Sequence, residues 1–282
     1  NLIINSFYPS SKISSIKEYE LFYQSSILSL SKILDKAKKE KINKILYTSS
    51  SAIYGSINFQ LSVKNDLNRN LYASTKLACE SMVSNFCSKN KAALIITRLF
   101  NMYGYNENFS FISRLVQSFL KKKEITLFNN GESIRDFIHI NDVCKIYIKL
   151  LQKQYNGVYE IGTGNGVKII DLIKILQKKN LKVKFIKNKI SEIDNSIAKL
   201  EPNFKKYKFI KLEDYLKKTL NTSFKKLNKK TSNEKNIILK TVKGYAIYGA
   251  GIAGIQIAKS IIDNKGEIAF FVDDNKNKLK KK

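Results

Sequence analysis

The chain has 282 residues, enough for one large domain or two, and a formal net charge of +28. This charge comes almost entirely from lysines spread along the sequence, whereas specific readers of nucleic acid favour arginine, so we expect no specific nucleic-acid partner. His139 is the only histidine, which excludes a multi-histidine metal site and a histidine-based triad, and we expect no metal. The three cysteines lack metal-ligand spacing and no apolar run is long enough to span a membrane, so we expect a protein of the reducing cytoplasm.

The first predicted elements deliver hydroxyl groups to one end of a sheet. Residues 2–4 are a short apolar run that predicts a strand ending at Asn5, and residues 16–41 show the apolar spacing of a helix. Residues 42–48 predict a buried strand, and three serines follow it at positions 49–51. Because ligands of open α/β sheets bind at the C-terminal ends of the strands, these serines form a candidate site.

Tyr72 and Lys76 open the next predicted helix. They lie four positions apart, so their side chains share one helical face. A free tyrosine has a pKa near ~10, and a neighbouring ammonium group lowers this pKa, so Tyr72 could act as a base toward a hydroxyl group. The same spacing recurs at two other places in this lysine-rich chain, so Tyr72 and Lys76 are distinguished only by the sequence motifs that precede and follow them.

Strands and helices alternate along the following 140 or so residues, up to about residue 220. The predicted strands are 93–97, 125–128 and 158–161, and the predicted helices are 109–120, 142–151 and 169–178. This alternation predicts a parallel sheet in a protein of the α/β class. Two polar segments, 98–104 and 131–139, interrupt the pattern and carry candidate ligand-binding side chains.

The C-terminal part contains a second pattern. Residues 221–243 are polar and predict a linker. A strand at 245–248, a helix at 255–262 and a strand at 268–272 follow, with Gly249, Gly251 and Gly254 after the first strand and Asp273 after the second. Glycines at this spacing allow a phosphate to approach a helix N-terminus, and an acid after the next strand holds a ribose, so these four residues are predicted to bind a dinucleotide.

Four segments in this order, the serine triplet with Tyr54-Gly55, the Tyr72/Lys76 helix, residues 98–104 and residues 131–139, resemble the extended short-chain dehydrogenase/reductase family. The resemblance covers residues 1–220 and is greatest to the nucleotide-sugar epimerases and dehydratases of that family. It implies a Rossmann-like doubly wound parallel sheet, incomplete at its N-terminus, with a smaller C-terminal substrate lobe. It also implies NAD as the cofactor, with NADP possible, a nucleotide-sugar substrate and a homodimer.

The resemblance assigns roles to individual residues. Tyr72 would abstract a proton, Lys76 would lower its pKa, and Ser50 would hydrogen-bond the same sugar oxygen, although Ser49 and Ser51 are near enough to leave that choice open. Where many family members have a helical asparagine, this chain has Ser26. The cofactor-binding residues that it implies are Asn5, Ser49, Tyr72 and Lys76, and the substrate-binding residues are Ser50, Ser51, Asn101, Arg135 and Phe137.

The resulting functional hypothesis is an NAD-dependent nucleotide-sugar epimerase, similar to UDP-glucose 4-epimerase, in the synthesis of surface polysaccharide precursors. Related dehydratases carry an Asp-Glu pair after the catalytic hydroxyl residue, whereas Ser51-Ala52 follows Ser50 here, which favours an epimerase or a reductase. A reductase or dehydratase of the same family and a non-catalytic nucleotide-binding module stay as alternatives.

The C-terminal segment 244–282 resembles the start of the nucleotide-binding domain that precedes the catalytic domain in membrane-bound polysaccharide-biosynthesis dehydratases. We therefore expect it to begin a second Rossmann-like domain. In the short-chain family the dinucleotide fingerprint precedes the Ser-Tyr-Lys set, so the fingerprint that serves Tyr72 is expected before Asn1. On this interpretation the chain alone would bind NAD poorly and be inactive.

Overall fold

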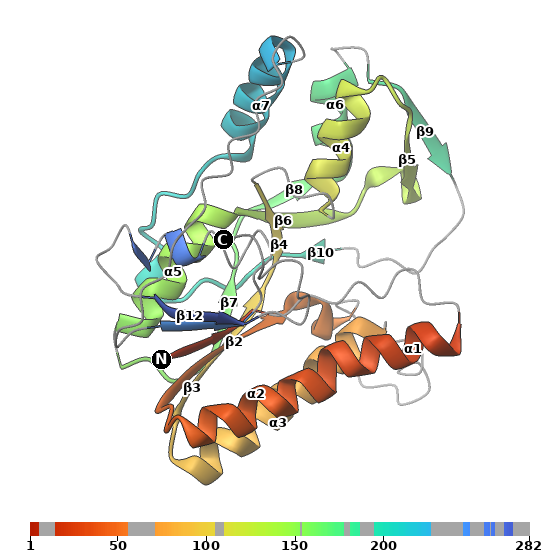
Figure 1. The fold of residues 1–282 in the computed structure, drawn as a ribbon. Coiled ribbons are helices and arrows are strands. Elements are labelled where there is room, and N and C mark those ends of the chain that lie inside the picture. Colours follow the sequence, from red (N-terminus) through yellow and green to blue (C-terminus); the bar gives the residue numbers. More distant parts are fainter. Residues whose placement is uncertain are drawn as a thin grey trace.

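The computed structural model describes residues 1–5, 15–55, 71–104, 110–152, 154–177, 181–186, 195–226, 245–248, 257–259, 261–262 and 268–272 (Figure 1). Its helices are α1 (Ile16–Tyr23), α2 (Ser29–Lys39), α3 (Leu71–Asn90), α4 (Phe111–Leu120), α5 (Ile140–Gln152), α6 (Ile169–Gln177) and α7 (Leu212–Lys226). No helix among these described residues is both long and apolar enough to cross a membrane.

The main sheet has six strands in the order β12-β11-β1-β2-β3-β7, and every neighbouring pair is parallel. These strands are β1 (Leu2–Ile4), β2 (Lys44–Ser50), β3 (Ala93–Leu99), β7 (Gly157–Ile161), β11 (Tyr245–Tyr248) and β12 (Ile268–Val272). Because all strands run in one direction, their carboxyl ends lie along one edge. The predicted α/β class and the doubly wound parallel sheet are confirmed.

Alternating side chains of the strands build two cores, one on each face of the main sheet. On one face Ile4, Ile45 and Tyr47 pack with buried residues of α2 and α3. On the other face Ile3 and Leu46 pack with α5 and with the C-terminal helical residues. Figure 1 shows α1, α2 and α3 together on one side of the sheet and α5 on the other. The helices thus cover both faces of the sheet, and the carboxyl ends of its strands share the edge at which α/β proteins bind ligands.

A second, smaller lobe lies beyond the carboxyl end of β3. Its strands are β4 (Asn101–Tyr103), β5 (Ile125–Phe128), β6 (Ile134–His139), β8 (Gly166–Lys168), β9 (Val183–Ile186) and β10 (Asn195–Ser196). The sheet β10-β6-β4 has β8 paired antiparallel to β6, and β5 pairs with β9. Buried residues of α4, α6 and α7 form the core of this lobe with β5 and β6. It corresponds to the small lobe that the sequence predicts.

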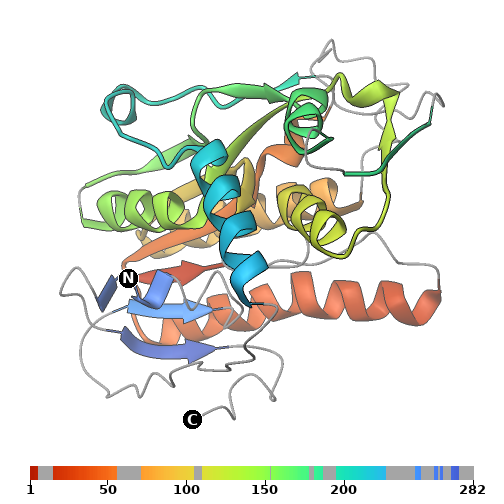
Figure 2. The ribbon, with the colours of Figure 1, turned by 90° about the horizontal axis from the view of Figure 1, so that it is seen from above.

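The structure differs from the sequence-based expectations in two places. The predicted helix 16–41 is two helices joined by a π-helical turn at Gln24–Leu28, in which the buried Ser26 hydroxyl donates to the carbonyl of Phe22 at 2.6 Å. The C-terminal strands β11 and β12, expected to begin a separate domain, are hydrogen-bonded into the main sheet beside β1. Figure 2 shows these two blue strands next to the red strand β1.

Candidate active site

Ser50 is the last residue of β2 and lies at the carboxyl edge of the main sheet. Its backbone is extended, and the chain then turns into the short 3-10 helix Ser51–Tyr54. The Ser50 hydroxyl caps this helix by accepting a hydrogen bond from the backbone N–H of Ala52 at 3.2 Å. The cap fixes the rotamer of Ser50 at the point where the strand leaves the sheet.

Tyr72 lies in the first turn of α3 and is hydrogen-bonded to Ser50. Burial raises the pKa of Tyr72 to about 12, and the hydrogen bond from Ser50 is the contribution that lowers it. The phenol is therefore protonated at neutral pH in the protein alone. The two hydroxyl groups lie within hydrogen-bond reach of each other, and their joint action on one sugar oxygen stays a prediction.

Lys76 lies one helical turn after Tyr72, and its side chain is buried. Its Nζ donates a hydrogen bond to the backbone carbonyl of Thr48 at 2.7 Å. The same nitrogen lies 5.1 Å from the ring centroid of Tyr47 and 5.8 Å from that of Tyr72. Burial lowers the pKa of Lys76 to about 8, with an opposing contribution from Glu80. The ammonium group is thus held under the sheet edge by a carbonyl and two aromatic rings.

We expected Lys76 to lower the pKa of Tyr72, but in this structure burial has the larger effect and raises that pKa. Desolvation of the phenolate outweighs the other contributions, so the pKa of Tyr72 moves up rather than down. Sequence reasoning could place the two residues on one face of a helix but could not measure how deeply they are buried. A base at this position needs further positive charge near the phenol oxygen.

Ser49 and Ser51 flank Ser50 in the sequence, and Asn5 follows β1, the strand that pairs with β2. The Ser49 side chain is buried, and its hydroxyl has no hydrogen-bond partner in the part of the chain that the structure describes. Ser51 begins the 3-10 helix, and Asn5 directly follows β1; both are partly buried. A buried hydroxyl without a protein partner is a candidate contact for a bound polar group.

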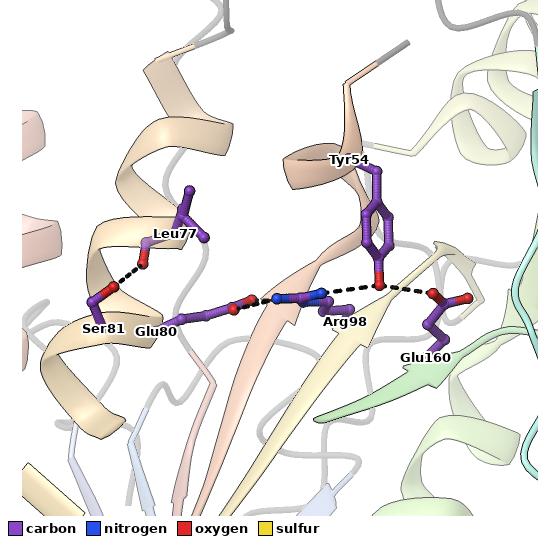
Figure 3. A network of polar contacts seen from close by, with 6 residues as sticks. All are labelled: Tyr54, Leu77, Glu80, Ser81, Arg98 and Glu160. Carbon is purple, nitrogen blue, oxygen red and sulfur yellow. Dashed lines mark hydrogen bonds and ion pairs between the residues drawn. The ribbon is translucent and has the colours of Figure 1, made fainter. Parts of the chain in front are cut away.

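A network of charged and polar side chains connects α3, the turn after Ser50, β3 and β7 (Figure 3). Arg98, at the end of β3, makes a two-pronged ion pair with Glu80 of α3, with Nη2–Oε2 at 2.8 Å and Nε–Oε1 at 3.2 Å. Its Nη1 donates to the Tyr54 hydroxyl at 3.2 Å, and this hydroxyl donates to Glu160 of β7 at 2.7 Å. The network ties α3, β3, β7 and the turn after Ser50 to one another.

Sequence analysis missed Glu80 and Glu160. Glu80 lies four residues after Lys76, and this spacing on one helix face was the available signal. Glu160 gave no local signal, because its partners Tyr54 and the backbone N–H of Lys199 come from distant parts of the chain.

The predicted substrate-binding residues Asn101, Arg135 and Phe137 lie in the second lobe. The Asn101 amide donates to the backbone carbonyl of Asp136 at 3.0 Å, and Arg135 donates to the carbonyl of Ile134 at 2.9 Å. Phe137 is buried in the core of that lobe and stacks on Phe111. The three residues share two neighbouring strands, β4 and β6, and their role toward a substrate stays a prediction.

The buried carboxylate of Asp136 joins the two lobes. It accepts hydrogen bonds from the backbone N–H groups of Thr163, Gly164 and Ala198 and from the Thr163 hydroxyl. A side chain at Gly162 would lie only 2.5 Å from the Ala198 side chain, so glycine is required for this close packing. Four donors compensate the buried charge, which makes Asp136 a structural residue.

Within the described ranges, no three residues among His, Cys, Asp and Glu are grouped so that they could hold a metal ion. The predicted dinucleotide-binding residues Gly249, Gly251, Gly254 and Asp273 lie outside the described residues.

Comparison with known proteins identifies relatives of this arrangement. The family model described as NAD dependent epimerase/dehydratase family matches residues 1–162. A dTDP-D-glucose 4,6-dehydratase of Dictyostelium discoideum is 29% identical over 178 residues, which are 57% of this chain and 41% of that protein. An ADP-L-glycero-D-manno-heptose-6-epimerase of Brachyspira hyodysenteriae is 27% identical over 150 residues, or 49% of this chain and 47% of that protein.

Among solved structures, the UDP-N-acetylglucosamine 4-epimerase of Methanobrevibacter ruminantium has the same fold, with a TM-score of 0.66 and 24% identity over 80% of this chain and 77% of that one. The chain spans about half the length of the curated relatives that it matches. The family model covers more than half of the chain, including Ser50, Tyr72 and Lys76. The chain belongs to the NAD-dependent epimerase/dehydratase family.

Proposed function

We propose that the protein is a nucleotide-sugar epimerase that acts at the Ser50–Tyr72–Lys76 centre with NAD as its cofactor. The observation that carries this proposal is the hydrogen bond between Ser50 and Tyr72 directly beside the buried ammonium group of Lys76. Two hydroxyl groups and a cation at the open edge of a parallel sheet fit the oxidation of a sugar hydroxyl. NADP is the second candidate cofactor.

The residues around this centre fit a dinucleotide. The buried Ser49 hydroxyl, for which the described residues provide no partner, offers a polar contact, and Asn5 lies at the end of the neighbouring strand. Lys76 and Tyr72 complete the predicted cofactor contacts. When bound, NAD supplies a hydride acceptor that can return the hydride to the sugar.

The roles of the chain's own residues follow from their environments. Ser50 holds the sugar hydroxyl by a hydrogen bond, and Tyr72 takes the proton from that hydroxyl at its phenol oxygen and later returns it. Because burial raises the pKa of Tyr72 to about 12, the phenolate requires positive charge nearby. Lys76 provides one such charge, 5.8 Å from the Tyr72 ring centroid, and is still mostly protonated at pH 7 with a pKa of about 8.

An epimerase is preferred over a dehydratase because no carboxylate follows Ser50 in the sequence; Ser51 and Ala52 stand there instead. The carboxylate of Glu160 is engaged by Tyr54 and by the backbone of Lys199, so it is not free to catalyse an elimination. A dehydratase stays the second candidate, since the Dictyostelium relative carries that name. A reductase and a non-catalytic nucleotide-binding module are the remaining alternatives.

We further propose that the substrate is a UDP- or dTDP-linked sugar, that Asn101 and Arg135 contact it, and that the protein works as a cytoplasmic homodimer in the synthesis of surface polysaccharide precursors. Arg135 is partly exposed on β6 and has the bidentate donor geometry that suits a diphosphate.

The test is to incubate the protein and NAD with UDP-glucose, UDP-N-acetylglucosamine and dTDP-glucose, with Tyr72→Phe as the control. We expect a C4 epimer without net consumption of NAD from one of these sugars, and no epimer from the variant. A 4-keto-6-deoxy product would support the dehydratase alternative. The absence of any turnover by a protein that binds NAD would support the binding module.

A further inference from the structure

The chain leaves the main sheet at Ser50 and enters a turn whose position depends on side chains. Up to Ser50 the strand is held by its ladder with β3, in which Ser50 pairs with Leu99. The next four residues, Ser51–Tyr54, form a single 3-10 turn, closed by a hydrogen bond from the Gly55 N–H to the Ala52 carbonyl. Because one 3-10 turn has few and poorly aligned internal hydrogen bonds, contacts of its side chains decide where it lies. Ser50 caps this turn, so its hydroxyl moves with it.

Tyr54, the last residue of the turn, is anchored both at its ring and at its hydroxyl group. The Cζ atom of Arg98 lies 5.2 Å from the ring centroid, and Nη1 of Arg98 donates to the hydroxyl at 3.2 Å. The hydroxyl in turn donates to Oε1 of Glu160 at 2.7 Å. Figure 3 shows the phenol oxygen between the guanidinium group and the carboxylate. Hydrogen bonds to charged groups are stronger than those between neutral groups, so these contacts hold the turn firmly.

Arg98 is itself attached to the helix that carries Tyr72 and Lys76. Its two-pronged ion pair reaches Glu80, which is buried on α3 about two helical turns after Tyr72. A continuous line of hydrogen bonds therefore runs from the helix of Tyr72 through Arg98 to the turn that Ser50 caps. This line fixes the two hydroxyl-bearing elements of the candidate active site relative to each other.

On its other side Tyr54 is connected to the second lobe. Oε2 of Glu160 accepts a hydrogen bond from the backbone N–H of Lys199 at 2.6 Å. Lys199 lies three residues after Ser196 of β10, and Ser196 pairs with Arg135 of β6. The carboxylate thus joins the Ser50 turn to the stretch of chain that lies beside a proposed substrate contact.

We propose that Tyr54 is a positioning residue for the reaction at Ser50: its hydroxyl group holds the Ser50 turn in place relative to Tyr72 through Arg98 and to the second lobe through Glu160. This inference deepens the proposed function and rests on it. Tyr54 takes part in no bond-breaking step and acts through Ser50. A small displacement of a group that orients the reacting hydroxyl is enough to lower a rate substantially.

The environment of the Tyr54 hydroxyl suits a positioning role rather than acid–base catalysis. Burial raises the pKa of Tyr54, the Glu160 carboxylate raises it further, and the hydrogen bond from Arg98 opposes this rise. The phenol is therefore protonated at neutral pH, and its proton is directed at Glu160. A donor that keeps its proton gives the turn a constant anchor.

The first experiment compares the steady-state kinetics of Tyr54→Phe and Tyr159→Phe. Tyr54→Phe keeps the ring and removes only the hydroxyl group. Tyr159→Phe is the matched control, because it removes a hydroxyl that donates to the Asn156 carbonyl at 2.9 Å, on the same strand as Glu160. We expect kcat for sugar turnover to fall about tenfold or more for Tyr54→Phe with KM within about threefold, and both to change less than about twofold for Tyr159→Phe. A kcat that falls less than about threefold, or equally in both variants, would overturn the proposal.

A double variant tests whether Tyr54 acts through Ser50. In the Ser50→Ala background the group to be positioned is gone, so Tyr54→Phe should lower kcat by less than about twofold. A tenfold loss in both backgrounds would show that Tyr54 acts independently of Ser50. If Tyr54→Phe unfolds, which circular dichroism would report, Glu160→Gln takes its place, because it removes one of the two acceptor oxygens and leaves Tyr54 intact. It should lower kcat severalfold when Ser50 is present and not when Ser50 is replaced; equal losses would overturn the proposal.

A measurement without substrate separates this inference from the function that it rests on. In protein isotope-labelled at the Cζ atoms of its tyrosines, the carbon NMR signal lost in Tyr72→Phe belongs to Tyr72 and reports the hydrogen bond of its phenol. We expect Tyr54→Phe to move this signal in the same direction as Ser50→Ala, and Tyr159→Phe to leave it in place. A Tyr72 signal that Tyr54→Phe does not move would overturn the inference.

The two readouts fail separately. A Tyr72 signal that depends on Tyr54, without turnover of any sugar nucleotide, would retain the positioning of Ser50 and refute the epimerase. Sugar turnover with the same kcat for Tyr54→Phe and the unchanged protein would retain the epimerase and refute the inference.

Discussion

Two basic side chains at the carboxyl edge of the sheet, Lys76 and Arg98, have opposite environments. Arg98 faces the carboxylate of Glu80, and this hydrogen-bonded ion pair raises the pKa of the guanidinium group. Lys76 is more deeply buried, has the neutral carbonyl of Thr48 as its hydrogen-bond acceptor, and its pKa falls to about 8. One charge has a carboxylate in direct contact, whereas for the other the effect of burial outweighs the opposing contributions of Cys79 and Glu80.

This difference distinguishes a charged group that stabilises the fold from one that can exchange its proton. A paired charge such as Arg98 holds elements together, and its protonation state is fixed over the whole physiological range. A charge such as Lys76, whose pKa is lowered by burial to about 8, gives up its proton more readily than that of an exposed lysine. The two kinds of behaviour lead to predictions that can be ranked by size.

The largest effect is expected for Tyr72→Phe. Removal of the phenol oxygen removes the hydrogen bond to Ser50 and the proposed proton acceptor, so sugar turnover should fall about 10²- to 10⁴-fold. The melting temperature should change little, since the ring stays in place. Turnover that persists at the original rate would show that another group is the base.

The next effect is expected for Arg98→Met, which leaves the buried carboxylate of Glu80 unpaired. The free energy of unfolding, measured with urea, should fall by about 3 kcal/mol. The double variant Arg98→Met/Glu80→Gln should recover a large part of this loss, because no isolated charge remains. If the double variant is as unstable as the single one, the ion pair is not the cause.

A third prediction concerns pH and Lys76. Between pH 8 and 10.5 the unfolded chain retains the Lys76 proton while the folded protein releases it, so the free energy of unfolding should rise with pH in this range. The contribution is on the order of 3 kcal/mol, and Lys76→Met should lack it. Lys39→Met, at an exposed lysine of α2, is the control and should follow the unchanged protein. Parallel curves for all three proteins would contradict the lowered pKa.

The smallest effect is expected for Lys168→Ala. Lys168 forms an ion pair with Glu132 at 3.2 Å, but both side chains are about half exposed. Its loss should change the free energy of unfolding by less than about 1 kcal/mol. A loss comparable to that of Arg98→Met would mean that burial does not explain the contrast between the two pairs.

The sequence was sufficient to predict the parts of the site that depend on local pattern. Tyr72 and Lys76 share a helix face because of their spacing, and Ser50 ends a buried strand, so the structure brings all three to one edge. The rise of the Tyr72 pKa and the role of Glu160 could not be predicted, because both depend on burial and on partners far away in the chain.

The position of β11 in the sheet could not be predicted from local sequence patterns either. Residues 245–248 predict a strand, and the structure has that strand, but strand propensity does not specify which neighbour a strand pairs with. Family resemblance pointed to a separate domain, whereas the structure pairs β11 with β1 and buries residues of the C-terminal helix in the main core.

The pairing of residues 2–4 with residues 246–248 also sets the order in which the protein can fold. In the sequence β11 follows β1 by about 240 residues, so the nascent chain carries β1 with the edge that later pairs with β11 still open while these residues are made. Contacts between such distant segments form slowly, and an open strand edge is a template for aggregation until its partner arrives. A chaperone that covers this edge during translation should therefore increase the yield of folded protein.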